Sequence, residues 1–184
     1  MKRVVIVIGA LVVAASLGTG TAVASHVSVN DANDTRAELD VRRVAHSGSD
    51  FPKWKISTFK AWGRQKIWDQ GYLAVYIDTF GTRRHDYYAL VWGGKNQLRS
   101  TLFRDRKDKG DYKVTELNFT RPSASSVKVT VPLNKLKLGS SRATYNWYVQ
   151  SVWTGKGCPE VCFDWAPDIG KSGGGIEEPL PLNL

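Results

Sequence analysis

The chain contains seven tryptophans, and tryptophan is a residue whose chemistry points to sugar binding. The axial C–H groups of a sugar ring form an apolar patch that suits the π surface of an aromatic ring. Trp62 and Trp165 fall in predicted loops, where exposure is expected. Trp147 and Trp153 share one face of a predicted strand, about 20 Å apart, so they can meet separate units of a polymer. The alternative for each of these rings is packing in a protein core.

Two aspartates suggest a calcium site. Asp78 lies near the end of a predicted strand and Asp86 follows in the same loop, and Ca²⁺ is bound by carboxylate oxygens. The spacing does not match an EF-hand loop, and Asp78 can instead cap the turn or pair with a neighbouring arginine. Asp164 and Asp168 form a second, looser acidic pair.

The only two cysteines, Cys158 and Cys162, are separated by three residues. Outside the cell such a pair is normally oxidised. A closed zinc site needs four ligands and no histidine lies near in the sequence, while a redox motif needs Cys-x-x-Cys. We therefore predict a disulfide that closes a ring of about five residues and stabilises a local loop.

The sequence gives little support for catalysis. It contains no His-Glu-x-x-His and no glycine-rich phosphate loop. His46 is followed by a polar segment up to Asp50, which could suggest a catalytic triad. A polar turn after a strand explains the same residues. A glycosidase needs two carboxylates about 5 to 10 Å apart in a cleft, and the sequence does not single out such a pair. Choosing Asp78 and Glu116 would be arbitrary. We expect a protein without catalytic residues.

The first 24 residues have the layout of a secretory signal peptide. Lys2 and Arg3 precede the apolar run Val4–Leu17, and Ala22-Val23-Ala24 forms a small-x-small cleavage site before Ser25. The apolar run is shorter than the roughly 20 residues that span a bilayer as a helix. We expect a secreted, extracellular protein with no stable membrane insertion after cleavage; the alternative is a retained N-terminal anchor.

The chain is basic, with a formal net charge of +9. Loss of Lys2 and Arg3 with the signal peptide would lower this charge by two, to about +7. The basic residues are scattered, and for an exported protein we expect a polysaccharide or an anionic cell-wall polymer as partner rather than nucleic acid.

Period-two alternation recurs along the chain and predicts about eight short strands. The expected strands are 39–46, 54–61, 72–80, 86–92, 97–104, 112–119, 126–131 and 145–153. Residues 62–70 are a candidate for a two-turn helix, and 133–138 for one helical turn. The pattern predicts an all-β fold with minimal helix, an antiparallel two-sheet β-sandwich of the jelly-roll kind.

The composition divides the chain into four segments. Residues 1–24 are the signal peptide and 25–37 a flexible lead-in rich in small polar residues. Residues 38–169 form a single β-sandwich domain. Residues 170–184, with three glycines in a row and two prolines, are expected to be a flexible C-terminal tail.

Several segments resemble a family of small secreted actinobacterial β-sandwich proteins. They are Asp40–Val44, Val75–Thr79, Asp86–Tyr88, Val127–Pro132 and Cys162–Asp168. In architecture the chain is similar to DOMON-like domains and to family-nine carbohydrate-binding modules. This resemblance implies a sandwich that binds sugars or, in some relatives, haem, and it carries over no catalytic residue.

The haem option conflicts with the methionine content. Cytochrome-type DOMON domains hold haem iron with a methionine and a histidine, and the sole methionine here is Met1, which leaves with the signal peptide. Ligation by two histidines would need His46 and His85 to meet. We expect no cofactor other than calcium.

Three functions are open at this point. The first is a secreted, non-catalytic binding or accessory module for a glycan or a cell-envelope polymer. The second is an interaction or structural protein of the envelope that has no small ligand and pairs through an exposed strand edge. The third is a hydrolase of unknown type.

Overall fold

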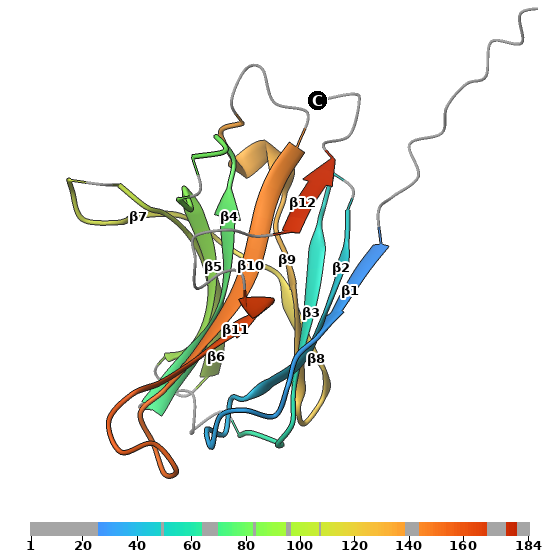
Figure 1. Cartoon of the computed structure of the whole chain (residues 1–184). Helices are drawn as coiled ribbons and strands as arrows, with labels where there is room; N and C mark the ends of the chain where they lie inside the picture. Colours follow the sequence, from blue (N-terminus) through green and yellow to red (C-terminus); the bar gives the residue numbers. More distant parts are fainter. Residues whose placement is uncertain are drawn as a thin grey trace, which may run out of the picture.

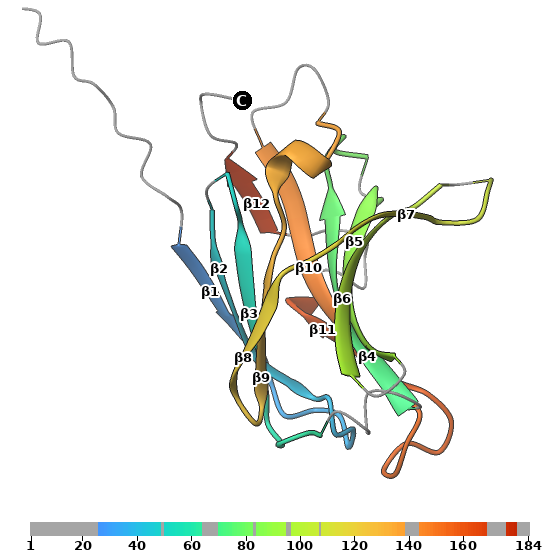
Figure 2. The same ribbon diagram turned by 180° about the vertical axis from the view of Figure 1, so that it is seen from behind.

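Two antiparallel β-sheets packed face to face form the fold, as the two views of the computed structural model show (Figures 1 and 2). The sequence-based prediction of an all-β sandwich is therefore confirmed. The described residues are 26–48, 50–63, 70–82, 84–94, 97–106, 108–138, 144–168 and 176–179. They contain twelve strands, more than the eight expected. Within these ranges the chain has no helix with the length and apolar character needed to cross a bilayer.

One sheet has five strands in the order β1-β2-β3-β9-β8. The strands are β1 (His26–Asn30), β2 (Val41–Ser47), β3 (Lys53–Thr58), β9 (Ser126–Thr130) and β8 (Phe119–Ser123). Neighbouring strands all run antiparallel, so the sheet combines N-terminal strands with a hairpin from the middle of the chain.

The other sheet has seven strands in the order β11-β10-β4-β5-β6-β7, with β12 also paired to β10. The strands are β11 (Cys162–Ala166), β10 (Thr144–Trp153), β4 (Gly71–Asp78), β5 (Tyr87–Gly94), β6 (Gln97–Arg104), β7 (Tyr112–Glu116) and β12 (Ile176–Pro179). β11 pairs with the end of β10 and β12 with its beginning, so the two short strands share one edge of β10.

The core lies between the two sheets and follows the predicted alternation. On β10, Tyr145, Trp147, Val149 and Trp153 are all buried, as their period-two spacing predicts. β4 lies between β10 and β5, and it buries Ala74 on its outer side as well as its inward residues. The predicted strand 72–80 is therefore central in its sheet, and Tyr72 and Tyr76 on its outer side stay partly exposed.

Three strands fall in segments where the sequence predicted none. β1 lies in the expected flexible lead-in, β11 in the expected loop around the disulfide, and β12 in the expected tail. β1 is mostly polar, but Val27 and Val29 pack against the core. Backbone pairing with a formed neighbour stabilises such edge strands, and their own apolar pattern is too weak to reveal them.

The predicted strand 112–119 is in fact two strands in different sheets. β7 ends at Glu116, Leu117 is buried, and β8 starts at Phe119 in the five-stranded sheet. Residues 121–123, which fall between two expected strands, belong to β8, and the chain reverses at Ala124 and Ser125. The chain thus crosses from one layer to the other within two residues, which a continuous alternation hides.

The two helix predictions have different outcomes. The turn predicted at 133–138 is confirmed as the 3-10 helix η1 (Leu133–Lys135), and Leu133 and Leu136 are buried against the core. Most of the candidate helix at 62–70 falls on residues 64–69, which lie outside the described residues.

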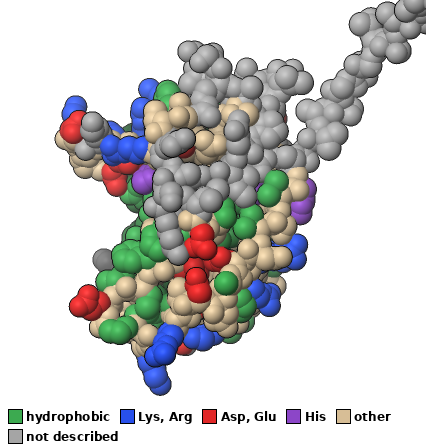
Figure 3. All heavy atoms as spheres, viewed as in Figure 1, with side chains coloured by type: hydrophobic (Ala, Val, Ile, Leu, Met, Phe, Trp, Pro, Cys, Tyr) green, Lys and Arg blue, Asp and Glu red, His purple; other side chains and the backbone are tan. Residues whose placement is uncertain are grey.

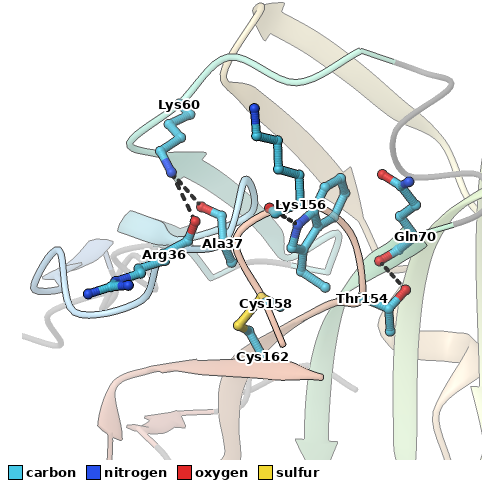
Figure 4. The surroundings of a disulfide bond; sticks show 9 residues. Arg36, Ala37, Lys60, Gln70, Thr154, Lys156, Cys158 and Cys162 are labelled. Carbon is cyan, nitrogen blue, oxygen red and sulfur yellow. Dashed lines mark hydrogen bonds between the residues drawn. A yellow bond between two sulfur atoms is a disulfide. The ribbon is translucent and has the colours of Figure 1, made fainter. Parts of the chain in front are cut away.

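The predicted disulfide between Cys158 and Cys162 is confirmed, and it closes the loop between β10 and β11 (Figure 4). Gly157 in this loop has a φ of +99° and lies so close to the Arg36 carbonyl oxygen that a Cβ would be 2.6 Å from it. The Trp153 indole N–H donates to the Lys156 carbonyl at 3.1 Å. The loop is therefore held by local contacts as well as by the disulfide.

Replacing both cysteines with serine is expected to lower the free energy of unfolding by at most about 2 kcal/mol, because the closed ring is so small. The melting temperature, measured for the double variant and for the reduced wild-type protein, checks this. Loss of all folded structure on reduction would contradict it.

Candidate functional site

Three of the four tryptophans predicted to contact a ligand are buried. Trp147 and Trp153 are 0% and 1% exposed in the core, and Trp62 is 3% exposed. Their proposed contact with an external sugar is wrong for this structure, because no ring face reaches solvent. Trp165 is half-buried on β11 and remains a candidate.

Trp62 is covered by an arginine from β8, the edge strand of the five-stranded sheet. The guanidinium carbon of Arg121 lies 3.8 Å from a Trp62 ring centroid, a cation–π distance. The same guanidinium donates to the carbonyls of Trp62 at 2.9 Å and Ala124 at 2.6 Å. The prediction that Trp62 is exposed is therefore wrong, because the Arg121 side chain from β8 lies over its ring.

The outer face of the seven-stranded sheet carries the partly exposed aromatic rings that the structure brings together. We call it the aromatic face. It consists of Tyr76, Tyr88, Phe103, Tyr148, Phe163 and Trp165. Strand register places these residues side by side, because their neighbours in sequence point inward to the core. Hydrophobic side chains gather over the lower part of this sheet, below the projecting β6–β7 arm, where the surface is hollowed (Figure 3).

Four rings form a row across four adjacent strands. Tyr148 on β10 stacks on Tyr76 on β4 with centroids 4.9 Å apart, and Tyr76 lies 5.8 Å from Tyr88 on β5. Tyr88 in turn stacks on Phe103 on β6 at 5.2 Å. These are cross-strand pairs in register, the arrangement that lets aromatic rings contact one another on a pleated surface.

The tyrosine hydroxyls in this row have defined hydrogen bonds. Tyr76 donates to Gln150 Oε1 at 3.0 Å and Tyr88 donates to Asp111 Oδ2 at 2.8 Å. Burial raises the pKa of both phenols well above the usual value, so each hydroxyl keeps its proton. Each oxygen still has lone pairs that can accept a hydrogen bond from a ligand.

A charged rim, formed by Arg84 and His85 before β5 and by Asp105 after β6, borders the row. His85 Nδ1 lies 3.4 Å from the Tyr148 hydroxyl, and His85 Nε2 lies 3.3 Å from Asp105 Oδ2. Arg84 donates hydrogen bonds from two of its guanidinium nitrogens to the Asp105 carboxylate, at 3.1 to 3.3 Å. Burial lowers the pKa of His85. The rim thus places fixed polar groups beside the aromatic rings.

Phe163 and Trp165 extend the face onto the edge strand β11. They stack with centroids 5.6 Å apart, and Phe163 is 45% exposed. Trp165 is paired in register with Gln150, the residue that binds the Tyr76 hydroxyl. The aromatic face is therefore continuous from β11 to β6.

The sequence contains a signal for this face in its tyrosines rather than in its tryptophans. Tyr72 and Tyr76 alternate with inward residues on β4, as do Tyr148 and Gln150 on β10. Aromatic residues at outward positions of neighbouring strands predict an aromatic outer face once the strands are paired. The pairing itself is not readable from periodicity.

The predicted calcium ligands Asp78 and Asp86 are occupied by the turn between β4 and β5. Asp78 Oδ1 accepts the N–H groups of Phe80 at 2.9 Å and Gly81 at 2.5 Å. Asp86 Oδ2 accepts both the N–H and the hydroxyl of Thr79, at 2.8 and 3.1 Å. N–H and hydroxyl donors of the turn bond to these oxygens, so the alternative that Asp78 caps the turn is confirmed.

The two histidines considered as paired haem ligands lie on opposite sides of one sheet. His46 is buried in the core, with Nε2 2.9 Å from the hydroxyl of the inward Tyr145. His85 contacts the outward Tyr76 and Tyr148. These two side chains do not share a site.

Comparisons with protein-family models, with curated proteins and with solved structures find no match to this chain. The resemblance to DOMON-like domains and family-nine carbohydrate-binding modules therefore stays a prediction. The functional argument depends on the geometry of the described residues.

Proposed function

We propose that this protein is a secreted, non-catalytic module that binds a polysaccharide or another cell-envelope polymer through its aromatic face. The signal-peptide layout and the disulfide support export, since disulfides persist outside the cell. The net charge, +9 for the full chain and about +7 after loss of Lys2 and Arg3, favours an anionic polymer among the candidates.

The observation that carries this proposal is the aromatic content of an outer sheet face. An antiparallel sheet with one face on the core normally carries polar residues on the other face. Here six aromatic rings lie on that other face, and Phe163 is 45% exposed. Contiguous exposed apolar surface on a protein is typical of a binding site.

The chemistry of the face suits a sugar chain. Phe163 offers ring surface against which the C–H groups of a sugar can pack. Hydroxyls of a sugar can bond to the phenolic oxygens of Tyr76 and Tyr88 and to the charged rim around Asp105. A ligand-binding face typically combines apolar surface with a few placed polar groups, and this face has both.

Retention on insoluble polysaccharides and on cell-wall fractions tests the proposal. We expect the purified protein to be retained by at least one of them. Retention that falls steeply between low and high salt would identify an anionic polymer, and retention insensitive to salt a neutral glycan. Retention by none of the fractions would contradict the proposal and favour an interaction protein without a glycan ligand.

Phe163→Ala is expected to weaken retention about tenfold, equivalent to about 1.4 kcal/mol, with an unchanged melting temperature. The ring is exposed on an edge strand, so its removal takes away ligand contact and little packing. Binding isotherms on the retaining polymer measure the change.

Phe51→Ala is the matched control, since Phe51 is 54% exposed on the turn between β2 and β3 in the other sheet. Equal weakening by both variants would exclude the aromatic face as the specific contact surface.

A further inference from the structure

A cluster of carboxylates lies apart from the aromatic face, where the loop between β1 and β2 meets β11. Asp34, Asp40 and Asp164 each place a carboxylate oxygen within 4.8 Å of the others. Asp164 lies between Phe163 and Trp165, and strand alternation turns it inward while they point outward. Its Oδ2 accepts the N–H of Val41 on β2 at 2.6 Å.

Several oxygens around this cluster are buried without a hydrogen-bond partner. Asp40 is 0% exposed, and neither of its carboxylate oxygens has a partner. The buried Asp31 Oδ2 and Thr35 Oγ1 also lack one. Four unpartnered oxygens thus fall within the ten residues from Asp31 to Asp40. Buried polar groups are nearly always satisfied in proteins, so such a concentration indicates a missing partner.

Negative charge dominates the cluster, because Asp34, Asp40 and Asp164 all place a carboxylate oxygen within 4.8 Å of one another. The cation acting on Asp40 is Lys60, whose ammonium group donates to the carbonyls of residues 36 and 37. One lysine does not balance three or more carboxylates.

The turn that holds Asp78 and Asp86 provides an internal contrast. Those carboxylates accept N–H groups from their own loop, and their charge is compensated by donors. Neither carboxylate oxygen of Asp40 has a hydrogen-bond partner of regular geometry, and the Thr35 N–H compensates its charge only in part. Acidic residues alone do not define a metal site, but buried, clustered and unpartnered oxygens together do.

We propose that Asp34, Asp40 and Asp164 bind a hard divalent cation, Ca²⁺, with Asp31 and Thr35 near enough in the loop to supply further oxygens. Two ligands at about 2.4 Å from one ion are at most about 4.8 Å apart, which matches the cluster. The ligand set is all oxygen, which suits Ca²⁺ or Mg²⁺ rather than zinc. Mg²⁺ keeps several of its waters, and the full burial of Asp40 favours the larger ion.

The ion would join parts of the chain that are distant in sequence. Asp34 and Asp40 precede β2 in the five-stranded sheet, while Asp164 belongs to β11 in the seven-stranded sheet. A shared cation would therefore fix β11 against the opposite layer. This inference stands without the proposed glycan function, since none of the three ligands lies on the aromatic face.

Calcium titration of the purified, chelator-treated protein at pH 7.5 tests the site. We expect a calorimetric binding isotherm with about one ion per chain. At 100 times the dissociation constant, we expect a rise in melting temperature of about 5 to 10 °C. MgCl₂ at the same concentration should give a smaller rise.

Two variants make the assignment specific. Asp40→Asn and the exposed Asp34→Asn are each expected to weaken calcium binding at least about tenfold, since each removes a charged ligand. Asp50→Asn, an exposed aspartate on the turn between β2 and β3, is the matched control and should bind like wild type. Asp34→Asn decides the matter if Asp40→Asn does not fold.

Two results would overturn the proposal. One is the absence of both heat and thermal stabilisation with 10 mM CaCl₂. The other is a calcium response of Asp34→Asn equal to that of wild type and of Asp50→Asn. Neither result bears on polymer retention by the aromatic face, so the two proposals fail independently.

Discussion

Trp147→Ala is expected to lower the free energy of unfolding by about 3 to 5 kcal/mol, a large part of the stability of a domain of this size. Trp147 is fully buried, and its ring lies 5.3 Å from that of His46 and 6.2 Å from that of Trp54. Removing the indole leaves a cavity between the two sheets and deprives these rings of their contacts. Denaturant unfolding monitored by fluorescence measures the loss.

Trp147→Phe is the control that separates volume from chemistry. It retains most of the apolar volume and is expected to lose much less stability than the alanine variant. If Trp147→Ala instead melted like wild type and lost polymer retention, Trp147 would be a ligand contact, and its burial in the core would be wrong. The same experiment on Phe163 is expected to give the opposite pattern.

Local periodicity was sufficient to predict the sandwich and which residues of a strand share a face, but not that the face with Trp147 and Trp153 is the core. The alternation of Tyr145, Trp147 and Val149 follows from the side-chain period of a strand, which depends only on local backbone geometry. The disulfide also follows from local spacing. These features need no knowledge of which strands pair.

The candidate site needed strand pairing, which the sequence does not display. Trp62 was expected to be exposed because its neighbours resemble a loop, yet Arg121, 59 residues later, covers it. The row from Tyr148 to Phe103 exists only because β10, β4, β5 and β6 are adjacent and in register.

The carboxylate cluster is an even stronger case of long-range assembly. Asp164 was noticed beside Asp168, but its actual neighbours Asp34 and Asp40 are more than 120 residues earlier. They meet because β11 joins the edge of β10 while its inward side faces β2. β11 itself was missed, since its aromatic residues point outward and its aspartate inward, the reverse of the usual pattern.

In the absence of calcium, the protein is expected to lose stability as the pH rises from about 4 to about 7. Asp40 and Asp31 have folded-state pKa values of about 6 and about 7, against a usual value of 3.8. The folded state therefore binds protons more tightly than the unfolded chain in this window, and ionisation favours unfolding. For Asp40 alone, a shift of about two pKa units corresponds to about 3 kcal/mol.

Charged groups on every element around the cluster take part in this effect. Asp164 on β11 and Asp34 in the loop raise the pKa of Asp40, and Lys60 after β3 opposes them. Asp168 adds repulsion on Asp31. Elsewhere, the pKa of His85 is lowered, which destabilises the folded state below about pH 6.5 and so has the opposite sign. A single pH profile would mix these contributions.

Melting curves recorded from pH 5 to pH 8, with chelator and with excess calcium, separate them. His85 contributes equally to both series, so the difference between the curves reports the carboxylate cluster. We expect this difference to be small at pH 5, where protons occupy the carboxylates, and to reach about 5 to 10 °C at pH 8. Asp40→Asn should melt above wild type in chelator at pH 8, since it removes a buried charge, and should show little calcium response. A difference independent of pH would mean that calcium acts elsewhere, because an ion bound by these carboxylates must compete with their protons.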